Sequence, residues 1–167
     1  WGPYTDQSEA SAFIARMEAE RERGERLELA IVDEQDRLLG ITGLSEFSKR
    51  DRRAVVGTWL GRAHWGTGAN AESKALVLAL GFGRLGLQRL SAYAHPENER
   101  SLRALERLGF VREGVLKAWH LHGGERRDVA ILRLLREDWE AGPAAEVPVT
   151  IEGDPPPRTY AGNLSSG

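Results

Sequence analysis

The sequence predicts a mixed α/β domain built around one sheet. The chain of 167 residues has the length of a single domain and is long enough to bury a core. Apolar periodicities follow the order helix, three strands, helix, strand, helix, two strands, which is typical of one sheet with helices packed on it. A loop rich in glycine joins the third of these strands to the second helix.

The N-terminal third is expected to form one helix and three strands. Apolar residues at helical spacing predict a helix over residues 8–23, and Gly24 stands where a helix commonly ends. These apolar residues are Ala10, Phe13, Ile14 and Met17. Two apolar runs, 27–32 and 38–44, flank the polar sequence DEQDR and predict two connected strands. A third strand is predicted over 54–60.

The following segment is expected to form two helices and three strands. The predicted elements are a helix over about 70–85, a strand over 89–94, a helix that begins after Asn98 and ends at Gly109, and a hairpin of strands 110–122 and 126–135. The sequence REDWEAG, which follows the hairpin, is interpreted as the polar end of the last strand.

A change of composition near residue 140 predicts a domain over 1–139 and a tail over 140–167. Pro, Gly and Ser dominate the tail, and residues 137–154 contain acidic residues but no Lys or Arg. Residues 147–151 are the one part of the tail for which a strand is predicted. We expect it to pair with an open sheet edge.

Composition excludes several classes of protein. The formal net charge of −2 and the pI near 6.1 disfavour a nucleic-acid binder. The chain has no cysteine, so disulfides, thiolate nucleophiles and Cys-ligated zinc are ruled out. No apolar run approaches the roughly 20 residues that span a bilayer, and no signal segment opens the chain. A cytoplasmic protein without a membrane partner is expected.

The loop GRAHWGTGAN, between a predicted strand and a predicted helix, is the most informative stretch. Its glycines let backbone N–H groups converge, and the helix start presents further donors to an anion. A phosphate or diphosphate is the expected ligand, although an ordinary strand-to-helix turn would need the same glycines. The loop lacks the Lys-Ser/Thr ending of a P-loop, which favours a diphosphate bound without a metal.

A second stretch, NERSLRALERLGFVREG, places Asn98 and Ser101 three residues apart at a helix start. Two interpretations stay open. Asn98 is either a plain helix cap that accepts a hydrogen bond from the Ser101 N–H, or, with Ser101, part of a polar ligand site.

Together these stretches resemble the GCN5-related N-acetyltransferase (GNAT) superfamily, in the branch of the ribosomal-protein acetyltransferases RimJ and RimL. The resemblance covers residues 5–139. It implies a mixed, mostly antiparallel sheet that is flanked by helices and splayed to hold acetyl-CoA. The family's first strand and helix have no counterpart before residue 8.

The resemblance also implies site residues. The pyrophosphate loop of the family falls on Trp65, Gly66, Thr67, Gly68, Ala69 and Asn70. The pantetheine arm falls along Trp59, Leu60 and Gly61, and the polar contacts of the family fall on Asn98 and Ser101. Trp65 and Asn70 depart from the family pattern, as does the strand over 54–60, which lacks the glutamate that serves many relatives as a base.

Without cysteine, acetyl transfer to an amine is expected to be direct, within a ternary complex. Ser101 is the candidate for protonating the leaving thiolate, directly or through water, although it could equally be a surface hydroxyl. Glu46 is a candidate base. Tyr93, His95 and a chain of water molecules are its alternatives, since α-amines deprotonate near pH 8.

The acceptor is predicted to be a primary amine, either a protein N-terminus or a small molecule. It would enter between the loop 45–53, the N-terminal helix and the last hairpin. A catalytically silent acyl-CoA-binding module is the alternative function. His120 and His122 have the spacing of a metal-binding pair on a strand, but no third ligand is evident and no metal is expected. The exposed edges of the last hairpin make a homodimer possible.

Overall fold

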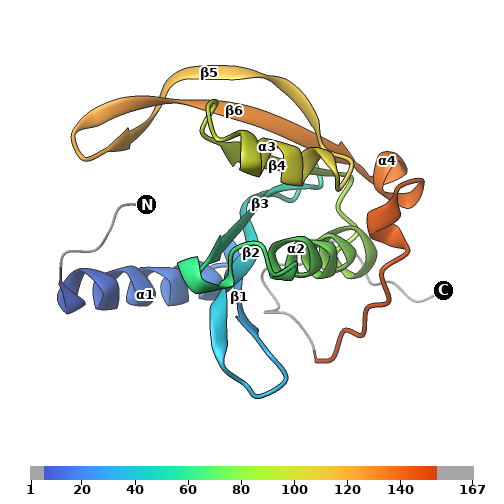
Figure 1. Cartoon of the computed structure of the whole chain (residues 1–167), viewed down its shortest axis with the longest axis horizontal. Coiled ribbons are helices and arrows are strands. Elements are labelled where there is room, and N and C mark those ends of the chain that lie inside the picture. Colours follow the sequence, from blue (N-terminus) through green and yellow to red (C-terminus); the bar gives the residue numbers. More distant parts are fainter. Residues whose placement is uncertain (1–5, 154–167) are drawn as a thin grey trace.

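The structure is a computed structural model that describes residues 6–153, and its centre is a six-stranded sheet (Figure 1). The strands lie in the order β1-β2-β3-β4-β6-β5. Their bounds are Arg26–Val32 for β1, Leu38–Ser48 for β2, Arg53–Leu60 for β3, Arg89–Ala94 for β4, Val111–His122 for β5 and Glu125–Leu135 for β6. Only the β3–β4 pair is parallel, so the predicted mixed, mostly antiparallel sheet is confirmed.

Helices follow the predicted order, with short additions. The main helices are α1 (Gln7–Glu22), α2 (Ala69–Ala79), α3 (Glu99–Glu106) and α4 (Arg136–Glu140). Single turns are η1 (Arg62–His64), η2 (Leu80–Arg84) and η3 (Pro143–Ala145). The single helix predicted over 70–85 is therefore α2 followed by η2, a π-helical turn. No helix among residues 6–153 is long and apolar enough to cross a bilayer.

The strands β3 and β4 pair over only four residues, and this short pairing shapes the site. Arg53 to Val56 lie opposite Arg89 to Ala92. Beyond Val56, β3 continues to Leu60 and is paired with β2 alone, while β4 continues to Ala94 and is paired with β6 alone. The sheet is therefore splayed between β3 and β4, as the family resemblance implies.

One core lies under α2 and α3 and extends across both halves of the sheet. Val77 and Leu78 of α2 share it with Leu102 and Leu105 of α3. Strand residues of the same cluster include Leu44, Val56, Leu90, Ala92, Ala94, Leu132 and Leu134. Since side chains alternate along a strand, the neighbours of these residues, among them Tyr93, lie on the opposite face of the sheet.

The interpretation of REDWEAG as the end of a strand is wrong, because residues 136–140 form α4. The Arg136 guanidinium donates hydrogen bonds to the carbonyl oxygens of Phe82 and Leu87, which turns the chain away from the sheet. The core also continues past residue 139. Trp139 stacks on Phe82 with ring centroids 5.2 Å apart, and Ala144 is 3% exposed.

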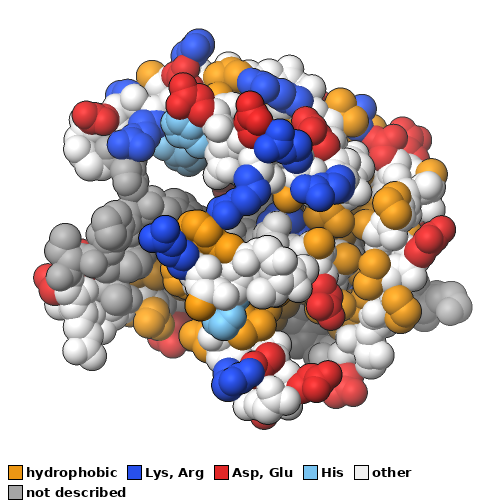
Figure 2. All heavy atoms as spheres, viewed as in Figure 1, with side chains coloured by type: hydrophobic (Ala, Val, Ile, Leu, Met, Phe, Trp, Pro, Cys, Tyr) orange, Lys and Arg blue, Asp and Glu red, His pale blue; other side chains and the backbone are white. Residues whose placement is uncertain are grey.

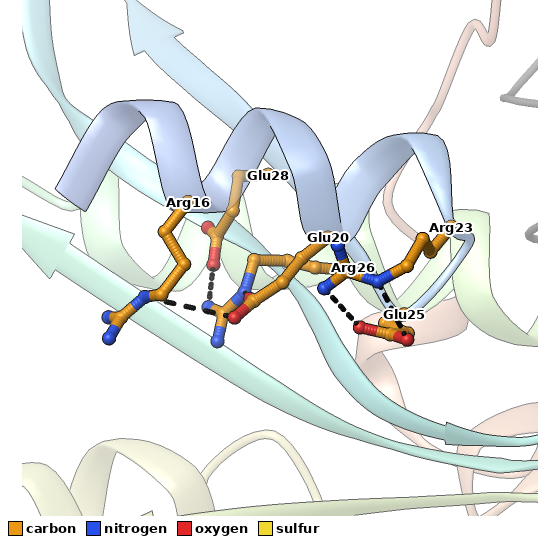
Figure 3. A network of polar contacts seen from close by, with 6 residues as sticks. All are labelled: Arg16, Glu20, Arg23, Glu25, Arg26 and Glu28. Carbon is orange, nitrogen blue, oxygen red and sulfur yellow. Dashed lines mark hydrogen bonds and ion pairs between the residues drawn. The ribbon is translucent and has the colours of Figure 1, made fainter. Parts of the chain in front are cut away.

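The strand predicted over 147–151 is also absent, since these residues form no ladder. Pro148 has no N–H to donate to a sheet. Among the described residues β1 pairs with β2 alone, so its other edge is open. The helix α1 lies beside β1, where Arg26 binds both Glu20 of α1 and Glu28 of β1 (Figure 3). Of the apolar residues predicted on α1, Phe13, Ile14 and Met17 are not in the core, and Ile14 is 55% exposed.

Candidate functional site

The loop between β3 and α2 has the backbone shape of an anion cradle. Gly66 and Gly68 adopt φ angles of 81° and 93°, a region that favours glycine. A Cβ at either position would meet nothing within 4 Å, so the space in front of both glycines is open. Gly68 is the N-cap of α2, and no side chain caps that helix.

The start of α2 is a place where a diphosphate could bind. The first N–H groups of a helix have no partner within the helix, and the helix dipole favours negative charge there. Residues 65–68 are exposed, and Ala69 and Asn70 begin α2 directly behind them. The predicted pyrophosphate loop thus forms one continuous exposed turn that leads into the start of α2.

The Trp65 side chain does not donate a hydrogen bond towards the cradle, because its indole N–H is used within the protein. Its indole Nε1 donates a hydrogen bond to the Leu60 carbonyl oxygen over 3.0 Å. Its ring carries the Arg100 guanidinium of α3 at 4.1 Å, while Arg62 lies 6.0 Å from the ring centre. Trp65 therefore ties the loop to the end of β3 and to the start of α3. Basic side chains gather between α3 and the start of α2 (Figure 2).

The α3 start confirms the capping role of Asn98. Its Oδ1 accepts a hydrogen bond from the Ser101 N–H over 3.1 Å. The Ser101 side chain is half-buried, and its hydroxyl has no hydrogen-bond partner among residues 6–153. Of the predicted pantetheine residues, Leu60 is buried in the sheet, whereas Trp59 points outward and is 57% exposed.

A bulge in β2 directs Glu46 towards β4. The register of the β2–β3 pair shifts between Ser45 and Ser48, and Glu46 within this bulge has a φ of 54°. A positive φ is uncommon for a residue other than glycine, and bulges commonly reorient side chains near functional sites. The Tyr93 hydroxyl donates to Glu46 Oε2 over 3.5 Å.

A second bulge brings β5 to the same tyrosine. The register of β5 against β6 shifts between Leu116 and His120, and Ala118 has a φ of 52°. The Asp128 carboxylate accepts hydrogen bonds from the Ala118 N–H and from Lys117, which holds the bulge in place. The His120 ring meets Tyr93 edge-on, with ring centroids 6.0 Å apart.

Glu46, Tyr93 and His120 thus lie together, although they come from β2, β4 and β5. Tyr93 is the first residue of β4 beyond its pairing with β3, so the group stands where the splay opens. Burial raises the pKa of Tyr93, and the neighbouring Glu46 carboxylate raises it further, so the phenol remains protonated and donates.

Sequence reasoning named Glu46 and Tyr93 but did not place His120 with them. The His120–His122 pair drew attention to metal binding instead, and no group of three or more metal-ligating residues exists in the described part of the chain. The His122 side chain lies outside the described residues. His95, the other candidate base, is exposed and accepts the Glu97 N–H at its Nδ1. The strand β3 offers no carboxylate, since its sequence RAVVGTWL contains neither Asp nor Glu, and Ala54, Val55 and Val56 are buried.

Comparison with known proteins identifies the family. Residues 1–111 match the family model described as an acetyltransferase (GNAT) domain. The uncharacterized N-acetyltransferase p20 of Bacillus licheniformis is 33% identical over 138 residues, which are 82% of this chain and 78% of that protein. The ribosomal protein uS5-alanine N-acetyltransferase of Escherichia coli is 27% identical over 149 residues, covering 85% and 77%.

Solved structures agree on the fold. A variant of the spermidine N-acetyltransferase SpeG from Vibrio cholerae superposes with a TM-score of 0.70 at 23% identity, covering 82% of this chain and 79% of that one. Its likeness concerns the fold alone. With the family model, the splayed sheet and the glycine cradle in agreement, the chain belongs to the GNAT family of N-acetyltransferases, which use acetyl-CoA as their cosubstrate.

Proposed function

We propose that the protein transfers an acetyl group from acetyl-CoA directly to a primary amine within a ternary complex. The observation that carries this proposal is the placement of two sites on opposite faces of the splay. The glycine cradle at the start of α2 lies on the helix-covered face, whereas Tyr93 alternates with the core residues Ala92 and Ala94 and lies on the other. Donor and acceptor would therefore meet where β3 and β4 separate.

On the donor side, main-chain groups do most of the binding. The N–H groups of residues 66–70 would hold the diphosphate, and the side of β3 that faces away from β2 would bind the pantetheine arm along residues 59–61. Asn98 is engaged in capping α3, so its amide nitrogen is the part left for the ligand. The Ser101 hydroxyl is the proposed proton donor to the thiolate.

On the acceptor side, Glu46 is the proposed base. The amine nitrogen attacks the thioester carbonyl carbon, the C–S bond breaks, and the amine loses a proton to Glu46 while the thiolate gains one from Ser101 or from water. Main-chain N–H groups near Leu60 would stabilise the oxyanion. Tyr93 holds the Glu46 carboxylate in place through its hydroxyl. Because the Tyr93 phenol stays protonated, a chain of water molecules is the alternative proton acceptor.

We further propose that the acceptor is a primary amine that arrives as the ammonium ion and releases one proton to solvent before its neutral nitrogen attacks. A carboxylate beside two aromatic rings is a favourable environment for an ammonium group. Two similar proteins are named for such acceptors, one as a ribosomal protein uS5-alanine N-acetyltransferase and the other as a spermidine N-acetyltransferase.

The test is acetyl-CoA turnover, read as thiol release, with a panel that contains spermidine, a peptide with an N-terminal alanine and a small monoamine. Release that depends on one of these amines is expected. Acetyl-CoA binding without turnover on any amine would favour the alternative, a catalytically silent acyl-CoA-binding module. Absence of acetyl-CoA binding in calorimetry would overturn both functions.

A further inference from the structure

Lys74 is a buried cation on α2. Its exposed fraction is 8%, and it lies on the covered side of the helix with Ser73, Val77 and Leu78. The chain has only three lysines, and the other two, Lys49 and Lys117, are exposed. Burial of an ammonium without a carboxylate is unfavourable, so a lysine at this position needs a physical reason.

The partner of Lys74 in residues 6–153 is a neutral amide. Its Nζ donates to Asn70 Oδ1 over 2.7 Å, one helical turn back towards the cradle. Because an ammonium can only donate, this contact fixes which end of the amide is oxygen. The Asn70 NH₂ group is then directed away from Lys74 and remains a donor in the first turn of α2, two residues after Gly68.

Among residues 6–153, the surroundings of Lys74 supply no counter-charge. On the sheet, Thr42 and Thr58 share a face with the core residues Leu44 and Val56, and their hydroxyls bond to each other. The charged residues of α2 and of the elements packed against it are Glu72, Glu46, Arg53 and Arg84, all of them exposed. Burial alone lowers the pKa of Lys74, to about 8.

We infer that Lys74 is a positioning residue for the acetyl-CoA diphosphate, because it orients the Asn70 amide towards the cradle and provides a buried positive charge that the diphosphate balances. The inference rests on the proposed donor site. It also gives the Asn70 side chain a role, since a residue without an amide could not connect Lys74 to the first turn.

This role implies that binding of acetyl-CoA is linked to protonation of Lys74. A diphosphate near Lys74 favours its charged form, so the pKa of Lys74 is higher in the complex than in the free protein. Below the free pKa, Lys74 is charged in both states and affinity does not change with pH. Above it, binding takes up a proton and affinity falls as the pH rises.

The experiment measures acetyl-CoA affinity by calorimetry between pH 7 and pH 9.5 for the wild type, Lys74→Met and Ser73→Ala. Acetyl-CoA has no free thiol to titrate, and Ser73→Ala disturbs a buried neighbour on the same helix without removing a charge. We expect the wild-type Kd to rise about threefold to tenfold over this range. In Lys74→Met we expect a Kd about tenfold weaker at pH 7 and independent of pH, whereas Ser73→Ala keeps the wild-type pH dependence.

Two further measurements separate the possible failures. In thermal unfolding without ligand, Lys74→Met should have a Tm equal to or above that of the wild type, because the substitution removes a buried charge. Its affinity for acetyl-CoA should nevertheless be lower. A lower Tm together with the wild-type pH dependence of Kd would show a merely structural lysine and overturn the inference. Acetyl-pantetheine, which lacks the diphosphate, should show no pH dependence. If neither the wild type nor Ser73→Ala binds acetyl-CoA at any pH, the proposed function itself fails.

Discussion

The backbone angle of Glu46 is the strongest indication of function at a single residue. A φ of 54° in a residue other than glycine costs about 1 kcal/mol or more. Such backbone strain is concentrated at functional sites. We predict that Glu46→Gln lowers kcat about 100-fold, because the amide cannot accept the amine proton, while the KM for acetyl-CoA is unchanged. Steady-state kinetics test this, with Glu34→Gln in the β1–β2 turn as the control. An unchanged kcat would move the base elsewhere.

Gly68 carries the second prediction at residue scale. Valine there would have a strained φ of 93°, and its methyl groups would occupy the open space of the cradle. We expect acetyl-CoA affinity to fall at least about tenfold, which is about 1.4 kcal/mol. The matched control is Gly86→Val, also at a positive φ with open space around it but remote from the cradle. Equal loss of affinity in both variants would show that backbone strain, not the cradle, is responsible.

Lys74 also makes stability depend on pH. Its pKa in the folded protein is lowered, so between the folded value of about 8 and the unfolded value the unfolded chain binds more protons. This lysine therefore makes the free energy of unfolding rise as pH increases above 8, by an amount on the order of 3 kcal/mol before other groups contribute. Urea unfolding at pH 8 and pH 10 without ligand should show a smaller rise in Lys74→Met. The same rise in both proteins would disprove the effect.

At the scale of elements, the sequence predicted those helix starts and turns that depend on residues close together in the chain. Asn98 at the start of α3 and Gly123-Gly124 between β5 and β6 act within a few residues, and both elements appear as expected. The bulges at Glu46 and Ala118 could not be predicted, because each depends on partners in another strand. The helix α4 was missed for the same reason, since Arg136 finds its carbonyl partners about fifty residues earlier in the chain.

The attachment of α1 to β1 depends on an ion-pair network (Figure 3). Arg26 is 18% exposed and contacts two carboxylates, whereas Arg23 pairs with Glu25 in a setting where both are about half exposed. Because Arg26→Met leaves the half-buried Glu28 without its ion-pair partner and leaves Glu20 only its 3.8 Å contact with the exposed Arg16, we predict a loss of about 2 kcal/mol in the free energy of unfolding. Arg23→Met should leave the free energy of unfolding almost unchanged, because solvent screens this exposed pair. Urea denaturation compares the two, and equal losses would contradict the burial argument.

At the scale of the whole molecule, the candidate site is a product of sheet topology. The order of residues 53–60 and 89–94 in the sequence does not reveal that their strands part after four paired residues. That separation is what places the cradle of α2 and the Glu46–Tyr93 pair on opposite faces of one opening. The glycine pattern was readable from the sequence because its donors are main-chain groups, whereas the acceptor side depends on side chains from three strands.

The folded domain extends beyond the boundary that composition predicts. Composition places it at residue 139, but Trp139 stacks on Phe82, and Ala144 is buried in the same core. We predict that a chain ending at residue 146 retains the free energy of unfolding within about 1 kcal/mol, whereas one ending at residue 135 loses about 3 kcal/mol or more, as when a core tryptophan is removed. Urea denaturation of the two shortened chains and of the full chain measures these differences. If the chain ending at 135 were as stable as the full chain, α4 and η3 would lie against the core without stabilising it.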